Sequence, residues 1–310
     1  MGFGNMLYRR LGKTELDVSA VGLGGWALGG GYDWGNIEFS DVRNTVSVAL
    51  NAGINLIDTA PVYGNSEEVL GRALASRRQD VVLCTKCGLV KNGSWTDHDL
   101  RSRTISLQLE NSLINLKTDY IDIYFIHYLD PKIPWENALE TLMRLQQQGK
   151  IRYIGVCNVP PEILTQMAQT GAIACVQDEL SLLHPAKGKT VLEVCQRYGL
   201  GFMAYGSLCG GILSGKYRRE PNLRRADARN YFYQCYRGEN FEHAQQIVAR
   251  VTQLAVQKGI PTAQVALAWV LAQQGVTCAL TGARSGGQIA QNAQAADIEL
   301  NVEELCNLTK

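Results

Sequence analysis

Apolar and polar positions along this chain follow two periods, one typical of strands and one typical of helices. Short apolar runs such as Ile54–Asp58 and Val81–Lys86 fit buried strands. Segments such as Ser66–Ala75 place apolar residues three or four positions apart, as amphipathic helices do. A glycine stands at or just after many helical segments, where a left-handed residue ends a helix. The pattern predicts alternating strands and helices.

The alternation continues through nearly the whole chain. Strands are expected at Val21–Gly24, Ile54–Asp58, Val81–Lys86, Tyr120–His127, Ile151–Cys157, Ala174–Glu179, Gly201–Tyr205 and Thr277–Thr281. Helices are expected at Val42–Gly53, Ser66–Ala75, Asp99–Leu116, Pro134–Gln148, Pro160–Thr170, Gly188–Tyr198, Phe241–Lys258, Thr262–Gln273 and Ser285–Ala295. Strict alternation implies a parallel sheet, and eight β/α units imply closure into a (β/α)8 TIM barrel.

Two additions to this α/β fold are expected. Tyr8–Ser19 fits a β-hairpin around Gly12 and Lys13 that caps the bottom of the barrel. Two helices, not one, separate the last two strands late in the chain. No Pro-rich or Ser-rich linker interrupts the pattern, so we expect one domain over residues 1–310.

Composition narrows the class of protein. Apolar residues make up 46% and charged residues 19%, and the formal net charge is +1. That balance argues against binding nucleic acid or a membrane surface through bulk electrostatics. No apolar run reaches the roughly 18–20 residues that span a bilayer, and Met1–Leu16 lacks the apolar core of a secretory signal. A cytoplasmic location is the expectation.

The nine cysteines favour reduced, buried thiols over a disulfide framework, because several lie in apolar strands, as Cys157 and Cys278 do. Cys84 and Cys87 have the spacing of a metal or redox pair. No second Cys/His pair accompanies them, and on a strand their sulfurs point to opposite faces. We therefore expect no metal site.

Three consecutive predicted strands end in an ionisable side chain: Asp58, Lys86 and His127. Strand alternation places each of them on the same face as the apolar residues two and four positions earlier, and adjacent strands lie about 4.8 Å apart. The three side chains should therefore meet at the carboxyl rim of the barrel, where barrel enzymes carry their catalytic groups. A structural ion pair beside a hydrogen-bonded core histidine is the competing interpretation.

Tyr63 follows Asp58 by five residues, in the loop that leaves the same strand. An isolated tyrosine has a pKa of about 10, and a neighbouring lysine ammonium is expected to lower that pKa. Asp58 would keep Lys86 charged, and His127 would orient a substrate carbonyl. Such a group suits protonation of a carbonyl oxygen while hydride reaches the carbon.

Longer stretches resemble the aldo-keto reductases. The matching segments are GINLIDTAPVYGNSEEVLG, VVLCTKCG, TDYIDIYFIHYLDP, IRYIGVCN, MAYGSLCGGILSGKY and ALTGARSGGQIAQNAQA, which span about residues 8–296. The resemblance implies a (β/α)8 barrel that binds NAD(P)H without a Rossmann domain. It also implies the catalytic tetrad Asp58, Tyr63, Lys86 and His127, with Tyr63 as general acid. The implied reaction is the reversible reduction of an aldehyde or ketone to an alcohol by hydride from nicotinamide C4.

Cofactor contacts follow from the same resemblance. Asn158 and Gln177 resemble residues that hold the nicotinamide carboxamide, and Tyr205 resembles the aromatic residue that stacks on the nicotinamide ring. The segment that resembles a pyrophosphate loop supplies Gly206, Ser207, Leu208, Gly210, Gly215 and Lys216. Glycine and clustered amides there suit phosphate.

The segment from Gly282 resembles the adenine end of the cofactor site. Arg284 resembles the group that meets a 2′-phosphate, which favours NADPH/NADP+ over NADH because guanidinium binds phosphate through two N–H groups. Gln288 and Asn292 resemble adenine contacts. Gln291 is also expected there, although relatives often carry an acidic residue at that place.

Gly22–Ala27 fits the dinucleotide fingerprint G-x-G-x-x-A, which requires a helix to begin at its end. Gly29–Gly31 follows instead and is a poor opening for a helix. We therefore interpret the segment as an exit loop of the first strand, with Gly24 and Trp26 near the nicotinamide.

Substrate contacts are expected from Trp26, Tyr63, His127 and Tyr128, and substrate choice from loops. The candidate loops are Cys87–His98, Tyr128–Pro134 and the basic segment Ser214–Asn240, where Tyr231, Phe232, Tyr233 and Tyr236 are expected to wall the pocket. The basic excess fits cofactor phosphates, an anionic substrate or a solvated face. We expect a small carbonyl compound as partner, no nucleic acid or membrane, and a monomer or weak homo-oligomer.

Two other functions remain open. A lyase or isomerase would use Lys86 as a Schiff-base nucleophile, which requires a neutral amine. A regulatory or redox-sensing NADPH-binding subunit would keep the same fold and cofactor with low turnover.

Overall fold

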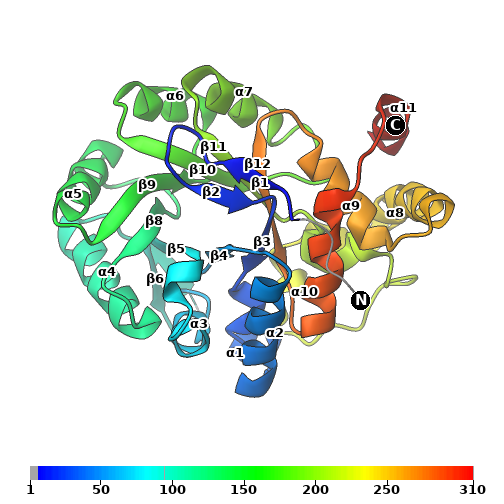
Figure 1. Ribbon diagram of the computed structural model, residues 1–310, viewed down its shortest axis with the longest axis horizontal. Helices are drawn as coiled ribbons and strands as arrows, with labels where there is room; N and C mark the ends of the chain where they lie inside the picture. Colours follow the sequence, from blue (N-terminus) through cyan, green and yellow to red (C-terminus); the bar gives the residue numbers. More distant parts are fainter. Residues whose placement is uncertain (1–5, 94, 310) are drawn as a thin grey trace.

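The computed structural model describes residues 6–93 and 95–309, and a closed barrel of parallel strands lies at its centre (Figure 1). In order around the barrel the strands are β3 (Val21–Gly24), β4 (Leu56–Asp58), β5 (Val82–Cys87), β8 (Ile121–Ile126), β9 (Ile151–Cys157), β10 (Ile173–Glu179), β11 (Gly201–Tyr205) and β12 (Val276–Gly282). Parallel pairing of β12 with β3 closes the ring. The predicted (β/α)8 barrel is confirmed.

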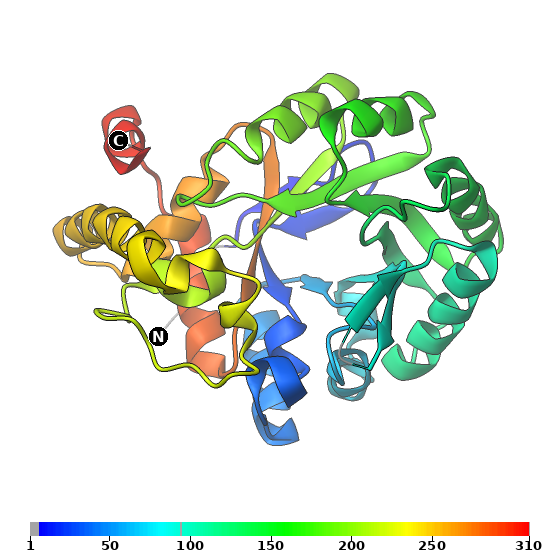
Figure 2. The same cartoon turned by 180° about the vertical axis from the view of Figure 1, so that it is seen from behind.

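Helices surround the barrel (Figures 1 and 2). The ring comprises α2 (Phe39–Asn51), α3 (Ser66–Leu74), α4 (Ser102–Leu116), α5 (Trp135–Gln147), α6 (Pro161–Gln169), α7 (Lys189–Tyr198) and α10 (Gly286–Ala293). Each helix buries one apolar stripe; in α5, Ala138, Leu142 and Leu145 are buried. The two additional helices are α8 (Gly238–Lys258) and α9 (Thr262–Leu271), and α9 is buried on all sides because α8 and α10 both contact it.

Among the described residues, the sequence pattern missed two helices and one two-stranded hairpin. A one-turn helix, α1 (Gly31–Trp34), begins where a glycine run seemed to exclude a helix. The strands β6 (Leu89–Asn92) and β7 (Trp95–His98) form an antiparallel hairpin inside a predicted loop. A last helix, α11 (Val302–Thr309), packs against α8 and extends away from the barrel (Figure 1). All three are short, and too few apolar residues repeat within them to set a period.

The N-terminal hairpin closes the amino end of the barrel, as predicted. Its strands β1 (Tyr8–Arg10) and β2 (Asp17–Ser19) pair antiparallel, and the hairpin crosses the barrel in Figure 1. Leu11, Leu16 and Val18 pack into the barrel interior with Leu56, Val82 and Ile123. This end of the barrel is therefore filled by side chains, and a ligand must enter from the carboxyl end.

The barrel interior is rich in sulfur. Cys84, Cys157, Cys175, Cys278 and Met203 lie together there, each at most 1% exposed. All nine cysteines are free and eight are buried, which confirms the predicted use of thiols as small apolar groups. Across the described residues, no group of three or more His, Cys, Asp or Glu side chains is placed to hold a metal ion.

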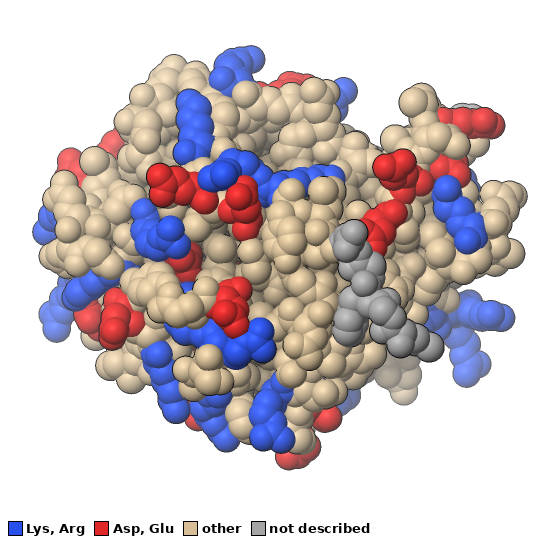
Figure 3. Space-filling model, viewed as in Figure 1, with Lys and Arg blue, Asp and Glu red and all other residues tan. Residues whose placement is uncertain are grey.

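The outer surface carries both signs of charge. On the face in Figure 3, lysine and arginine side chains lie among aspartate and glutamate side chains, in keeping with the small net charge. Over residues 6–93 and 95–309 no helix combines the length and the apolar character that a membrane crossing requires.

The turn of the N-terminal hairpin depends on Gly12. Its φ is +55°, and a Cβ there would lie 2.4 Å from the backbone nitrogen of Gly201 and 2.9 Å from the carbonyl oxygen of Ala174. Gly149 has a similar φ of +74°, but a Cβ there would meet nothing within 4 Å. The two glycines thus share a left-handed backbone and differ in the space around them.

We expect Gly12→Ala to lower the free energy of unfolding by about 2–4 kcal/mol and Gly149→Ala by about 1 kcal/mol. Both variants strain the backbone, and only the first also forces β10 and β11 away from the hairpin. Urea unfolding followed by tryptophan fluorescence measures both. Equal losses would mean that the hairpin is not wedged against these strands.

Candidate active site

A cavity of about 1360 Å³ opens at the carboxyl end of the barrel. Residues near the carboxyl ends of seven strands line it: Gly24, Asp58, His127, Asn158, Gln177, Tyr205 and Gly282. Pockets for one small ligand usually measure about 300–1,000 Å³, so this cavity has room for a large cofactor and a substrate together.

Lys86 lies beneath the cavity floor with no exposed surface. Its Nζ donates to both carboxylate oxygens of Asp58 at 2.7 Å and to the carbonyl oxygen of Thr59 at 2.9 Å. An ammonium has three donors, so all of them are used. Asp58 also accepts a 2.8 Å bond from Nε2 of Gln177. As strand alternation predicted, Asp58 and Lys86 meet at this rim.

The pair keeps Lys86 charged. Burial alone would lower the pKa of Lys86, but the charge of Asp58 and its hydrogen bonds outweigh burial and raise that pKa. At neutral pH the side chain is therefore an ammonium, with its charge compensated by one carboxylate.

Tyr63 lies on the turn between β4 and α3, held by a bond from its N–H to the carbonyl of Ala60. The turn packs against the exit loop of β3 so closely that a Cβ on Gly29 would lie 1.7 Å from the carbonyl oxygen of Tyr63. The ring of Tyr63 stacks on Trp26 at 5.7 Å, and its centroid lies 5.0 Å from Nζ of Lys86. The glycine run after β3 thus brings Trp26 and Tyr63 together.

The pKa of Tyr63 is raised overall, so the expectation of a lowered pKa is wrong, although Lys86 does act in the lowering direction. Burial raises this pKa and outweighs the opposing charge of Lys86, and the charge of Asp58 adds to the rise. Because Lys86 is already paired with Asp58, much of its field is cancelled. At neutral pH Tyr63 is a phenol, able to give a proton.

His127 follows β8 and is fixed by a bond from its N–H to the carbonyl of Cys87. Its ring lies edge-on to Tyr63 at 5.8 Å and stacks on Tyr128 at 5.3 Å. Burial, and next the charge of Lys86, hold the pKa of His127 well below its usual range. The imidazole is neutral near pH 7 and can donate one hydrogen bond.

Two amide side chains lie beside these groups in fixed orientations. Asn158, with a left-handed φ of +55°, accepts a 2.7 Å bond from the hydroxyl of Tyr205 and donates a 3.0 Å bond to the carbonyl of His127. One N–H of Asn158 remains, and Gln177 keeps its Oε1 and one N–H after bonding Asp58. The cavity floor therefore offers a donor and an acceptor about one strand apart.

The loop after β11 carries several left-handed residues, Gly206, Cys209, Gly210 and Gly211. Such left-handed residues are typical of loops whose amide groups bind anions, and here the N–H groups of Cys209 and Gly211 bond the carbonyls of Gly206 and Leu208 within the loop. Most of the predicted pyrophosphate loop lines the cavity, including Ser207, Leu208 and Lys216, whereas Gly215 does not.

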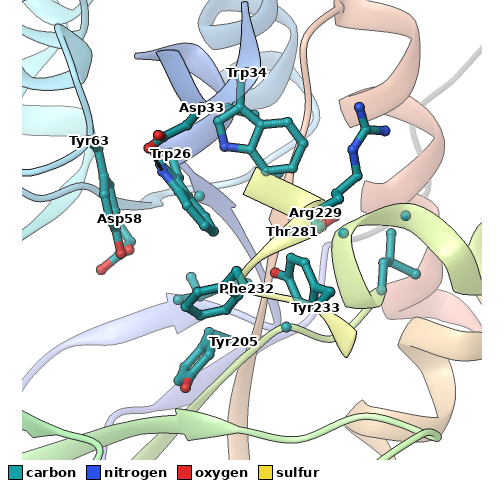
Figure 4. Close-up of a pocket in the computed structure, with 18 of the residues that line it drawn as sticks. Trp26, Asp33, Trp34, Asp58, Tyr63, Tyr205, Arg229, Phe232, Tyr233 and Thr281 are labelled. Carbon is teal, nitrogen blue, oxygen red and sulfur yellow. Dashed lines mark hydrogen bonds between the residues drawn. The ribbon is translucent and has the colours of Figure 1, made fainter. Parts of the chain in front are cut away.

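Two loops meet across the cavity mouth (Figure 4). Asp33 of α1 accepts a 2.9 Å bond from Nε1 of Trp26 and a 2.8 Å bond from the hydroxyl of Tyr231, and Trp26 packs edge-on against Phe232 at 5.0 Å. Four aromatic residues were expected to wall the cavity: Tyr231, Phe232, Tyr233 and Tyr236. The first three line the cavity, while Tyr236 is buried behind it. Asp33 was not expected.

The predicted adenine end lies at the β12–α10 junction. The terminal nitrogens of Arg284 donate to the carbonyls of Trp34 and Asn36, while Gln288 accepts from the backbone N–H of Arg284. Asn292 is 5% exposed and donates a 2.9 Å bond to Thr281. Arg284, Gln288, Gln291 and Asn292 all line the cavity.

The predicted site residues thus gather around one cavity. Only Lys86, which lies beneath the floor, Gly215 and the predicted wall residue Tyr236 do not line it. Residues that the sequence missed come mainly from α1, where Tyr32 and Trp34 follow the glycine run, whereas Arg229 belongs to the basic segment already expected near the cavity. The residues of α1 could have been predicted from the sequence, because aromatic residues follow a glycine run where the first strand ends.

Comparison with known proteins agrees with this geometry. The profile of the aldo/keto reductase family matches residues 20–310. The chain is 35% identical to the aldo-keto reductase YhdN of Bacillus subtilis over 96% of this chain and 91% of that protein. It is 34% identical to the NADH-specific methylglyoxal reductase of Escherichia coli, over 94% of each chain. The glycerol dehydrogenase AKR11B4 of Gluconobacter oxydans superimposes with a TM-score of 0.88 at 34% identity, over 97% of this chain and 93% of that one.

The contribution of the buried Asp58–Lys86 pair to stability can be tested. We expect Asp58→Asn to lower the free energy of unfolding by about 3–5 kcal/mol, because Lys86 would remain buried without a counter-charge. The double variant Asp58→Asn/Lys86→Met should lose clearly less free energy of unfolding, because no unpaired charge remains buried.

The variants should also differ in pH dependence. In Asp58→Asn the pKa of Lys86 falls below its unfolded value, so the unfolded state binds more protons and stability should rise from pH 7 to 9. In the wild type the raised pKa keeps the contribution of Lys86 constant over that range. Urea titrations at both pH values measure this, and a wild-type slope in the single variant would contradict the assignment.

Proposed function

Because the chain belongs to the aldo/keto reductase family, whose members are oxidoreductases acting on carbonyl compounds, we propose that it reduces an aldehyde or ketone to an alcohol with NADPH. The observation that carries the proposal is the position of Tyr63. Its ring lies within 6 Å of the charged amine of Lys86 and of the neutral imidazole of His127, at a cavity open only at the carboxyl end.

The cavity floor fits a nicotinamide carboxamide. That group has an NH2 that needs an acceptor and a carbonyl that needs a donor. Gln177 keeps a free Oε1 and Asn158 keeps a free N–H, so the two amides are complementary to it. Tyr205 lies beside them, and the left-handed turn from Gly206 to Gly211 would receive the pyrophosphate. When bound, the reduced nicotinamide supplies hydride to the carbonyl carbon.

We assign the proton transfer to Tyr63. As a phenol at neutral pH, it would give its proton to the carbonyl oxygen and become a phenolate. The ammonium of Lys86 would stabilise that phenolate, and Asp58 holds the ammonium in place. His127, being neutral, would donate one hydrogen bond to the carbonyl oxygen and orient it without competing for the proton.

The charged state of Lys86 disfavours the Schiff-base alternative. A nucleophilic amine needs a neutral nitrogen with a free lone pair. Here the pKa of Lys86 is raised, and all three of its donors are occupied by Asp58 and Thr59.

We further propose that the chain prefers NADPH to NADH. Arg284 keeps three of its five donors after bonding two backbone carbonyls, and it directly precedes α10, whose N-terminus favours negative charge. Gln288, Gln291 and Asn292 line the same side of the cavity and would contact adenine. One relative is named as NADH-specific, so the preference has to be tested on this chain.

The remaining expectations also stand as proposals. The chain would act as one domain, in the cytoplasm, on a small carbonyl compound that contacts Trp26 and Tyr128. Both of these aromatic residues line the cavity beside Tyr63 and His127.

Replacing Tyr63 by Phe tests the proton donor. We expect Tyr63→Phe to reduce turnover of a carbonyl by at least about 100-fold, the usual worth of general acid catalysis, with little change in NADPH affinity. Absorbance of NADPH and quenching of tryptophan fluorescence measure the two quantities. Tyr233→Phe, which removes another hydroxyl at the cavity wall, is the control. Turnover retained by Tyr63→Phe would remove the assigned role.

Replacing Arg284 by Ala tests the cofactor preference. The variant also loses its contacts with Trp34 and Asn36, which should weaken both cofactors alike. The ratio of NADPH to NADH dissociation constants is therefore the readout. We expect that ratio to rise by about 10-fold or more, as charge-assisted phosphate contacts are worth roughly 1.5–3 kcal/mol. An unchanged ratio would eliminate Arg284 as the phosphate ligand.

A further inference from the structure

The hairpin β6–β7 forms one wall of the cavity, mainly through one face, and Trp95 of the other face also lines the cavity. Its register pairs Leu89 with His98 and Lys91 with Thr96. Paired residues share a face of a two-stranded sheet, and these four residues all line the cavity. The alternate pair, Val90 with Asp97, does not line it. The wall therefore has an apolar residue and a histidine at one level, and a lysine and a threonine at the next.

Lys91 has no counter-charge on this wall. Within residues 6–93 and 95–309, no hydrogen bond or ion pair engages its ammonium, and Asp97 lies on the outer face, where it accepts from Asn92. Two arginines of the cavity are engaged in hydrogen bonds, and the ammonium of Lys216 lies 4.9 Å from the ring centroid of Tyr217. Arg229 bonds Asp227 and Tyr217, and Arg284 bonds backbone carbonyls.

The hairpin is also remote from the proposed cofactor side. It follows β5, and two strands, β3 and β4, separate β5 from β12, where Arg284 lies. Lys216 belongs to the loop after β11 and lies against Gly211. Lys91 is therefore the cation of this cavity placed away from the phosphates of a bound dinucleotide.

A stack of rings connects the hairpin with the reaction centre. His127 stacks on Tyr128 at 5.3 Å, and Tyr128 stacks on His98 at 5.7 Å. Nδ1 of His98 lies 2.8 Å from the carbonyl oxygen of Leu129. A carbonyl oxygen only accepts, so Nδ1 carries the proton and Nε2 is left for a ligand. Lys91 and Thr96 lie one further step along the strands, about 7 Å beyond.

From this arrangement we propose that the substrates are carbonyl compounds with an anionic group, a carboxylate or phosphate, at the end remote from the carbonyl. The proposal rests on the proposed carbonyl reduction. The carbonyl lies at Tyr63 and His127, a flat or apolar body lies along Tyr128 and Leu89, and Lys91 and Thr96 bind the anion. An anionic substrate group at this end of the cavity would give the exposed ammonium of Lys91 a counter-charge.

A matched pair of aldehydes tests the proposal. The probes are 4-carboxybenzaldehyde and its neutral methyl ester, methyl 4-formylbenzoate, each assayed with NADPH. We expect Lys91→Gln to lower kcat/KM for the carboxylate by about fivefold relative to the ester, because an exposed charge contact is worth that much. The ratio between the two substrates cancels any general loss of activity.

Three comparisons make the result specific. Lys91→Arg, which keeps the charge, should keep the wild-type ratio within twofold. Lys132→Gln removes the same charge from an exposed residue in the loop after β8 that does not line the cavity, and it should leave the ratio unchanged. The wild-type preference for the carboxylate should also fall as salt is raised.

The outcomes separate the two proposals. Reduction of the ester with an unchanged ratio in Lys91→Gln, or an equal shift in Lys132→Gln, would overturn the anion subsite and leave carbonyl reduction intact. Reduction of neither aldehyde by the wild type would overturn carbonyl reduction at this site, and the subsite with it.

Discussion

The rest of the site depends on one constraint, the burial of an ammonium at the carboxyl end of an apolar barrel. Lys86 has no exposed surface, and an uncompensated charge there would cost several kcal/mol. Asp58 and the carbonyl of Thr59 occupy all three of its donors, so the amine has a single geometry. Gln177 bonds the same carboxylate from the opposite side of the barrel. Much of the polar cavity floor is thus positioned by one ion pair.

The same pair determines the proton states around it. Because Asp58 absorbs part of the field of Lys86, burial dominates the pKa of Tyr63, which is raised. No carboxylate contributes to the pKa of His127, which is lowered by burial and by the charge of Lys86. Near neutral pH the three groups are a phenol, an ammonium and a neutral imidazole, the states that carbonyl reduction requires. The expectation from the sequence considered the charge of Lys86 and not burial, and so predicted a lowered pKa for Tyr63 where the pKa is raised.

Much of the fold and of the site follows from local patterns. The eight strands, the capping hairpin and the convergence of Asp58 with Lys86 follow from periodicity and from strand ends alone. The hydrogen bond between Tyr231 and Asp33 could not be predicted in this way, because 198 positions separate the two residues and no period connects them. Likewise α1 depends on left-handed Gly30 and Gly31, a backbone conformation that the period of apolar residues does not report. In the β6–β7 hairpin, β7 is exposed throughout and the apolar residues of β6, Leu89 and Val90, are adjacent, so no alternation marks the two strands.

The sulfur-rich interior has a consequence for chemical reactivity. Cys84, Cys157, Cys175 and Cys278 are enclosed by the hairpin below and by the ion pair above, and burial raises the pKa of each thiol. Only a thiolate reacts readily with oxidants and alkylating agents, so these four react when the barrel opens. Cys306 on α11 is exposed in the folded protein. The protein therefore contains both a fast thiol and a set of slow ones, and the slow modification rate is a direct measure of how often the barrel comes apart.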